Sequence, residues 1–217
     1  MADPTSRPTP LFEAAASPPG GRVTRLAVAF ELGLGLLAMV VAWLVGYPLL
    51  TTIRPSVPGS ALALLATLPL LGALWGLLTS NWPPIRRLVD ELERSVIPLF
   101  RRCTAIQLFA IAAAAGIGEE LLFRGLIQGA ITSAAGPAIG LFAASLLFGL
   151  AHAITGIYAV LAAVVGVYLG LLGLLTGGVW VPIVVHALYD LVALTVSTRS
   201  HRTDPVPEEA EDEASSH

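Results

Sequence analysis

Six ionisable side chains stand in stretches of apolar sequence that are long enough to cross a bilayer. They are two glutamates with an arginine, a single histidine, and a histidine with an aspartate: Glu119, Glu120, Arg124, His152, His186 and Asp190. A charge at the bilayer centre costs about 2.5–3.5 kcal/mol on insertion scales, so such groups usually face a polar cavity and serve a function. A carboxylate beside an imidazole can activate water as a general base, and the same groups can bind a divalent metal that activates water. Both routes predict a hydrolytic site.

The fragment from Glu119 to Arg124 predicts different roles for its two carboxylates. Adjacent residues of a helix point about 100° apart, so Glu119 and Glu120 cannot face the same partner. Glu120 and Arg124 are four residues apart and can pair on one side of the helix. Glu119 then points into a different sector, away from the arginine, and is left free to act on water.

Each histidine in the apolar sequence stands four residues from a side chain that can contact it. Phe148 precedes His152 by about one helical turn, and Asp190 follows His186 by about one turn. The Asp190 carboxylate can orient the His186 ring, or both groups can bind one ion. The chain has only four histidines, and the other two stand in the polar tail. We therefore predict that His152 and His186 belong to one assembled site.

The composition predicts an all-α, polytopic membrane protein built as a helical bundle. The 217 residues are 55% hydrophobic and only 12% charged, with a mean hydropathy of +0.79. A soluble domain is about a quarter charged, so lipid must cover much of this surface. A helix needs about 20 apolar residues to cross a bilayer. The sequence contains six such stretches, at residues 25–47, 59–80, 103–131, 137–154, 156–176 and 179–197.

The distribution of arginine predicts how the bundle lies in the membrane. Residues 82–102 are amphipathic, begin sharply at Pro83-Pro84 and carry five arginines, so we expect them to lie along the membrane surface. Loops rich in positive charge stay on the cytoplasmic side. With both termini cytoplasmic, only Arg54 of the loop arginines falls on the other side. We therefore expect an integral protein of the cell membrane with both termini in the cytoplasm.

One transmembrane domain, residues 23–198, is expected to form most of the chain, with the candidate motifs within 103–195. We expect the proline-rich segment 1–22 and the acidic segment 199–217 to be disordered, and the first of them does not resemble a cleavable signal peptide. The chain has one cysteine, Cys103, so no intramolecular disulfide can form. Nucleic acid is not an expected partner, because no basic face is evident. The expected partners are membrane lipid and a membrane-associated protein or peptide substrate, and the oligomeric state is left open.

Glu31 is the one further acid within the apolar sequence. It stands near the start of the first expected span, six residues after Arg25. We expect its side chain to reach the membrane interface, or to pair with Arg25 or another arginine, and we do not place it in the site.

Three motifs at defined spacings resemble those of a known family. Glu-Glu-x-x-x-Arg at 119–124, Phe-x-x-x-His at 148–152 and His-x-x-x-Asp at 186–190 occur in this order on three expected helices. The set resembles the CAAX prenyl proteases and bacteriocin-processing proteins, also called the Abi family of intramembrane proteases. The resemblance covers about residues 103–195. It implies an all-helical endopeptidase that cuts membrane-associated proteins or peptides near the membrane surface.

The resemblance also implies roles for individual residues. Glu119 would activate water, and His152 would polarise that water or bind a metal. His186 and Asp190 would complete the site, which would be shaped by Glu120, Arg124 and Phe148. The last motif position is usually Asn in the CAAX-cleaving branch, whereas an ionised Asp190 can accept hydrogen bonds but cannot donate them. An aspartate at this position therefore favours a role as a metal ligand or as an anchor for His186. In this respect the chain resembles the bacterial-type branch of the family.

Several alternatives remain open at this point. The residues fit a glutamate-dependent mechanism without a cofactor, and they fit Zn²⁺ or another divalent metal, with the ligands Glu119, His152, His186 and Asp190. A non-catalytic immunity or scaffold protein could sequester a peptide or partner with the same fold. A transporter could use the buried groups as a proton or cation relay, although no internal repeat is evident. An intramembrane aspartyl protease is disfavoured, because its two motifs would occur in reversed order and with Glu119 in place of an aspartate.

Overall fold

The computed structural model describes residues 20–200, and all regular structure in this part of the chain is helical. The helices are α1 (Gly20–Leu44), η1 (Leu49–Thr52), α2 (Val57–Thr79), α3 (Pro83–Ser95), α4 (Ile97–Phe100), α5 (Ala105–Glu120), η2 (Leu121–Gln128), α6 (Gly129–Ala135), α7 (Pro137–Ala151), α8 (Gly156–Thr176) and α9 (Trp180–Ser200). The predicted all-α class is confirmed. The expected disordered segments lie outside the described residues, apart from 20–22 and 199–200, which are helical.

Five helical stretches are long and apolar enough to cross a membrane. They are α1, α2, the continuous stretch Ala105–Ala135, α8, and Trp180–Arg199 of α9. The span predicted at 137–154 is shorter than expected, because α7 has 15 residues and is about 22 Å long, against a hydrocarbon core of about 30 Å. α7 ends where His152 leaves the helical conformation, and the side chain of Thr155 then begins α8 by accepting a hydrogen bond from a backbone N–H. His152 thereby stands at the end of a helix that is too short to reach across the bilayer.

The long central stretch Ala105–Ala135 is not a uniform α-helix. α5 gives way after Glu120 to η2, a π-helix, before α6 resumes the α-helical form. A π-helix closes its hydrogen bonds over five residues instead of four, and such segments occur frequently at functional sites. The change begins at the residue that follows the predicted Glu119-Glu120 pair.

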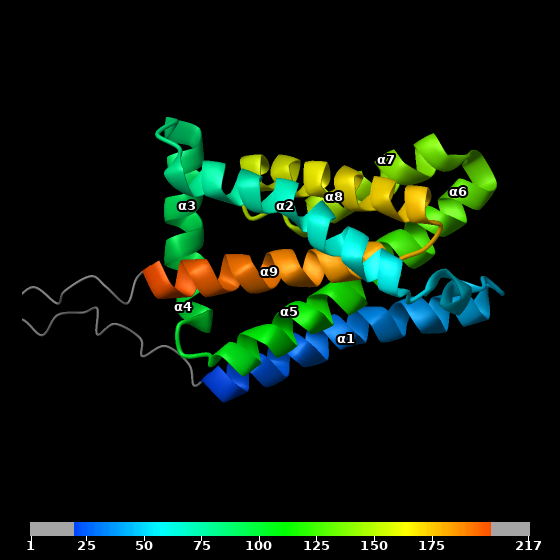
Figure 1. The fold of residues 1–217 in the computed structure, drawn as a ribbon, viewed down its shortest axis with the longest axis horizontal. Helices are drawn as coiled ribbons and strands as arrows, with labels where there is room; N and C mark the ends of the chain where they lie inside the picture. The colour runs from blue at the N-terminus through cyan, green and yellow to red at the C-terminus, as the bar shows by residue number, and fades with distance from the viewer. Residues whose placement is uncertain (1–19, 201–217) are drawn as a thin grey trace, which may run out of the picture.

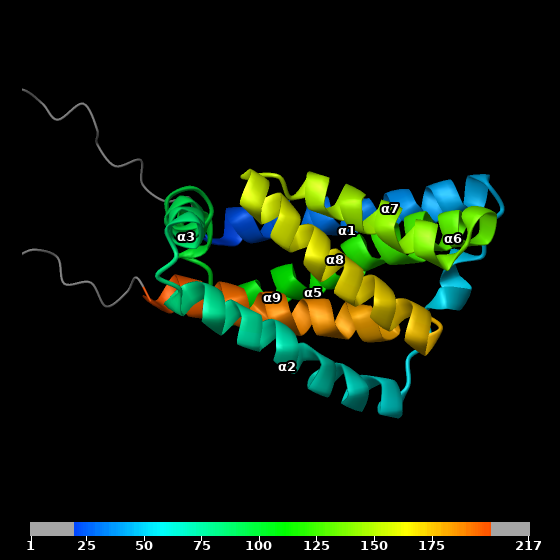
Figure 2. The same cartoon turned by 90° about the horizontal axis from the view of Figure 1, so that it is seen from above.

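α5 lies at the centre of the bundle, with α1 and α9 packed along it (Figures 1 and 2). α2 covers α9, and α7 and α8 form a hairpin that packs on η2 and α9. Glycine brings the neighbours of α5 close. A Cβ atom on Gly118 would overlap the Glu31 carbonyl oxygen of α1, and one on Gly116 would lie 2.8 Å from the Ile183 carbonyl oxygen of α9. The backbones of three helices therefore meet around Glu119.

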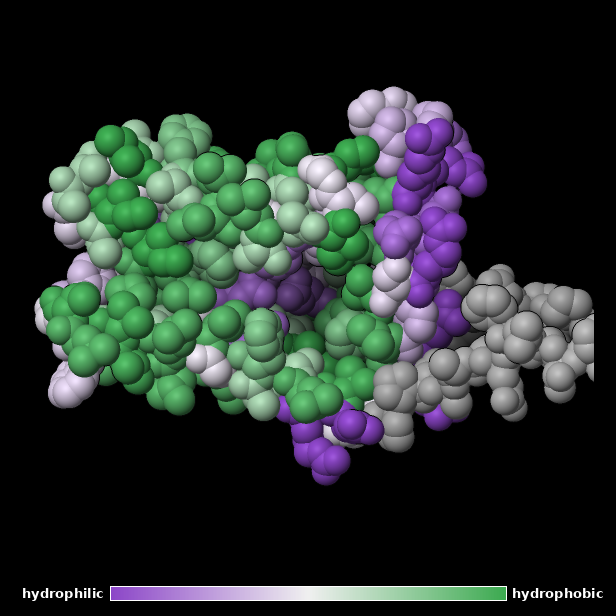
Figure 3. Space-filling view, turned by 180° about the vertical axis from the view of Figure 1, so that it is seen from behind, coloured by the Kyte–Doolittle hydropathy of each residue, from purple (hydrophilic) through white to green (hydrophobic). Residues whose placement is uncertain are grey.

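The predicted amphipathic segment 82–102 is helical and forms α3 and α4, and it begins at Pro83 as predicted. α3 crosses one end of the bundle, where α1 begins and α9 ends (Figure 1). Ile85 and Leu88 of α3 are buried, while its outer side is hydrophilic (Figure 3). This arrangement suits a helix at a membrane surface.

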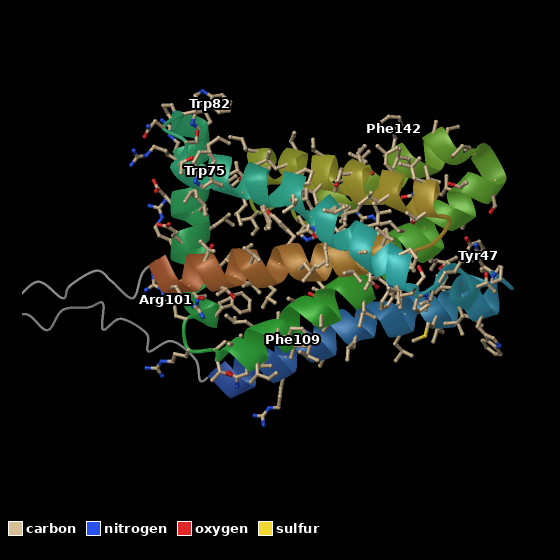
Figure 4. All side chains as sticks on the ribbon, viewed as in Figure 1. Tyr47, Trp75, Trp82, Arg101, Phe109 and Phe142 are labelled. Atoms are coloured by element: carbon tan, nitrogen blue, oxygen red, sulfur yellow. The ribbon has the colours of Figure 1, made fainter. Side chains whose placement is uncertain are left out.

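Large apolar side chains cover the flanks of the bundle. Trp75, Phe109 and Phe142 point outward (Figure 4) and are 71%, 53% and 64% exposed. Such a surface has no favourable contact with water but fits the acyl chains of lipid. The protein is therefore an integral membrane protein, as its composition predicted.

Candidate active site

A buried network of charged side chains joins α5, η2 and α9. Arg124 Nη1 donates a hydrogen bond to Glu120 Oε1 at 2.8 Å, so these residues form the pair that their spacing predicted. His186 Nδ1 lies 2.8 Å from the same oxygen. The Glu120 and Arg124 side chains are only 0% and 2% exposed. A buried charge without a partner is very costly. Arg124 and His186 therefore stabilise the Glu120 carboxylate, and the loss of any of the three would leave a buried charge less compensated.

Arg124 also connects the network to the α7–α8 hairpin. Its Nη2 donates to the Gly166 carbonyl oxygen of α8 at 3.3 Å. Its guanidinium carbon lies 4.2 Å from the centre of the Phe148 ring, within the range of cation–π attraction. Phe148 in turn packs against His152, with ring centres 4.4 Å apart. Phe148 therefore forms a wall between the buried ion pair and His152.

His186 is held between two carboxylates. Its Nδ1 contacts Glu120, and its Nε2 lies 3.4 Å from Asp190 Oδ2. The predicted neighbourhood of His186 and Asp190 is present, but the shorter contact is the one with Glu120, from a helix 66 residues earlier. With a carboxylate at each ring nitrogen, the orientation of the imidazole is fixed.

Glu119 and His152 face each other on the other side of this network. His152 Nε2 lies 3.7 Å from Glu119 Oε2, which is too long for a hydrogen bond. The Glu119 oxygen is buried and has no hydrogen-bond partner among the described residues. His152 Nδ1 lies 2.9 Å from the Phe148 carbonyl oxygen, which can only accept, so Nδ1 carries a proton. Nε2 is the nitrogen left to face Glu119, across a gap that a water molecule can bridge.

The paired groups lie well inside the bundle rather than at its surface. Glu119 stands about 21 Å along α5 from Ala105, at 1.5 Å per residue. α1 and α7 each pack on η2, with little contact between them. Seen from behind, the hydrophobic face is hollowed between the α1 side and the α7–α8 side, and hydrophilic side chains form the floor of the hollow (Figure 3). The polar interior is therefore open toward the lipid-facing surface.

Glu31 lies near the site, although the sequence analysis did not place it there. Its Oε2 is buried and has no hydrogen-bond partner among the described residues. The Glu31 side chain is close enough to interact electrostatically with Glu119, His186 and Asp190. The contact of the Glu31 backbone with Gly118 brings it there. Sequence spacing could not reveal this contact, because it joins two helices.

The structure thus brings together all seven residues that the motifs selected, and adds Glu31. They form two adjoining groups, one built on Glu119 and His152 and the other on Glu120, Arg124, His186 and Asp190. Within residues 20–199, no three His, Cys, Asp or Glu side chains converge as they would around a metal ion. The predicted metal ligands do not meet at one point in this arrangement.

The part of the chain that contains this site is similar to a known protein family. Residues 101–192 match the model of the Rce1-like family, described as type II CAAX prenyl endopeptidase Rce1-like. The matched segment runs from the turn before α5 into α9 and contains every residue of the three motifs. No curated protein and no solved structure matches the chain. This segment is therefore similar to the Rce1-like family, and the predicted resemblance to CAAX proteases is confirmed.

Proposed function

We propose that this protein is an intramembrane endopeptidase in which Glu119 activates the attacking water. The main support is the Glu119 oxygen that has no hydrogen-bond partner among the described residues and lies 3.7 Å from His152 Nε2. A carboxylate and an imidazole at this separation can both bind one water molecule. The match to a family of endopeptidases supports the reaction class.

The reaction follows from where protons can go. Glu119 accepts a proton from the water as the water oxygen attacks the scissile carbonyl carbon, and His152 holds the water through Nε2. When the C–N bond breaks, the protonated Glu119 returns that proton to the leaving amine. Glu120, Arg124 and His186 stay bonded to one another throughout. Their role is to fix His186 and the Phe148 wall beside the reacting atoms.

The substrate is a membrane-associated protein or peptide. It reaches the site through the hollow between α1 and the α7–α8 hairpin, which faces lipid (Figure 3). A prenylated C-terminus belongs to this class and is suggested by the family description. The arginine-bearing α3, the start of α1 and the end of α9 share one end of the bundle (Figure 1), which supports a cell-membrane protein with cytoplasmic termini.

The first experiment compares membrane-protein termini in host cells that express the wild type or Glu119→Gln. We expect new termini with the wild type, and their loss with Glu119→Gln, because an amide cannot accept the proton from water. Mass spectrometry of the termini provides the measurement. Glu91→Gln makes the same chemical change on the exposed side of α3 and should cut like the wild type.

The other outcomes of this comparison would overturn the proposal. Identical termini in all three strains, with folded Glu119→Gln still supporting the cellular phenotype, would favour a protein that sequesters a peptide or partner. Cleavage that persists in Glu119→Gln would assign the chemistry to another group.

A glutamate-only mechanism predicts that cleavage survives removal of metal. The ligands predicted for Zn²⁺ are divided between the two groups of the site, so we expect purified protein to keep its activity after exhaustive chelation. Elemental analysis, together with the cleavage rate before and after chelation, provides the check. About one equivalent of divalent metal, lost in His152→Ala or His186→Ala together with activity, would establish the metalloprotease alternative.

A further inference from the structure

The proposed hydrolysis needs a hydrogen-bond donor in addition to the groups that activate the water. As water adds to the scissile carbonyl, its oxygen becomes negatively charged, and preorganised donors stabilise such oxyanions. Arg124 already donates to Glu120 and to the Gly166 carbonyl oxygen. Both ring nitrogens of His186 face carboxylates. An ionised Asp190 has no proton to give.

His152 does not fill this gap either. Its Nδ1 proton is directed to the Phe148 carbonyl oxygen, and its Nε2 faces Glu119, where the water is held. The contacts described for Arg124, His152 and His186 thus engage these side chains with other partners. A donor from outside the motifs would leave these contacts intact.

Tyr158 is a hydroxyl-bearing residue beside His152. It belongs to the first turn of α8, where its backbone N–H is held by the Thr155 side chain. Its ring stands edge-on to the His152 ring, with centres 6.3 Å apart and planes at 65°. The side chain interacts electrostatically with both Glu119 and Asp190. The Tyr158 side chain is partly buried, and no hydrogen bond of its hydroxyl is found among the described residues.

Tyr189, the other tyrosine near the site, is directed elsewhere. Its ring packs on the apolar cluster between α2, α8 and α9, and of the acids named here it interacts electrostatically only with Asp190. Among the described residues, Tyr158 is the tyrosine whose ring lies beside the His152 ring, with centres 6.3 Å apart.

We propose that the Tyr158 hydroxyl donates a hydrogen bond to the oxyanion of the tetrahedral intermediate. This role rests on the proposed endopeptidase function. The water oxygen bonds to the carbonyl carbon, its proton passes to Glu119, and the carbonyl electron pair moves to the oxygen that Tyr158 holds. Collapse of the intermediate re-forms the carbonyl, breaks the C–N bond and transfers the Glu119 proton to the amine. Tyr158 keeps its own proton and returns to its starting state.

Tyr158→Phe tests the role because it removes the hydroxyl and retains the ring beside His152. The full chain is reconstituted in liposomes with an internally quenched peptide spanning a Glu119-dependent cleavage site found in membranes. Loss of one oxyanion donor costs about 10²–10³ in kcat, so we expect a fall of that size with KM little changed. Tyr168→Phe is the matched control on the same helix, because that hydroxyl donates instead to the Ala66 carbonyl oxygen of α2. It should leave kcat unchanged.

A second variant separates a donor from a structural hydroxyl. Incorporation of 3-fluorotyrosine at position 158 keeps the ring and the hydroxyl but makes the phenol more acidic. We expect kcat to be retained near neutral pH, and the loss of rate at alkaline pH to begin at a lower pH than in the wild type. A structural hydroxyl would not move the pH profile.

The outcomes distinguish this role from the proposed function. If Glu119→Gln abolishes cleavage while Tyr158→Phe leaves kcat unchanged, the Tyr158 role is wrong and the endopeptidase proposal stands. An unshifted pH profile with 3-fluorotyrosine also overturns the Tyr158 role. If the wild type produces no Glu119-dependent cleavage site, both proposals fall together.

Discussion

Replacing Arg124 with methionine should destabilise the protein by about 3–5 kcal/mol. Arg124 is the cation paired with Glu120, and both side chains are almost completely inaccessible. Methionine fills much of the same volume but leaves the Glu120 carboxylate with His186 as its remaining partner. Removing one member of a buried ion pair typically costs this much, because the other charge then stays buried with less compensation. Unfolding of purified protein in mixed micelles, monitored by helical circular dichroism, measures the loss.

Two further variants show whether the loss comes from the charge. Glu120→Gln combined with Arg124→Met removes both charges and should recover a large part of the stability, since no uncompensated carboxylate remains. Arg94→Met breaks an exposed pair with Glu91 on α3 and should change stability by no more than about 1 kcal/mol. Equal destabilisation by the single and double variants would mean that lost packing, rather than the buried charge, explains the effect.

Local spacing was enough to predict the pairs that form within one helix. Glu120 and Arg124 pair as expected because residues four apart share a helix face, even though the segment after Glu120 is a π-helix. The second partner of Glu120 is His186, which lies on α9. That contact depends on how α5 and α9 cross, and no local pattern in the sequence specifies the crossing. The motifs therefore predicted which residues lie together, but they did not predict that Glu120 pairs with both Arg124 and His186.

Hydropathy located the membrane spans but misjudged where two of them begin or end. The apolar sequence continues past Ala151, so a span to residue 154 was expected, whereas α7 stops before His152. The first helix begins at Gly20, five residues before its predicted start, so Glu31 lies about 16 Å along the helix instead of near its entrance. At that position the Glu31 backbone packs against Gly118 of α5, which explains why the side chain lies near the site.

The second large effect is expected at Gly118, where α1 and α5 are in backbone contact. A Cβ atom added there would overlap the Glu31 carbonyl oxygen, and backbone cannot move aside as a flexible side chain can. Gly118→Ala must therefore push α1 away from α5. Overpacking of this kind typically costs about 1–3 kcal/mol. Because Glu119 is the next residue, we also expect the separation of the helices to impair cleavage, and both unfolding and cleavage rate should be measured.

Gly33→Ala on α1 provides the comparison, because its added Cβ would meet no atom within 4 Å. Alanine favours a helix over glycine by up to about 1 kcal/mol, so this variant should be at least as stable as the wild type and fully active. Comparing Gly118→Ala with Gly33→Ala separates the effect of the α1–α5 contact from the general effect of replacing glycine in a helix. If Gly118→Ala were as stable and as active as Gly33→Ala, α1 would be free to move without affecting Glu119. The first helix would then be a cover for the site rather than a part of it, and the proximity of Glu31 to His186 would have no catalytic consequence.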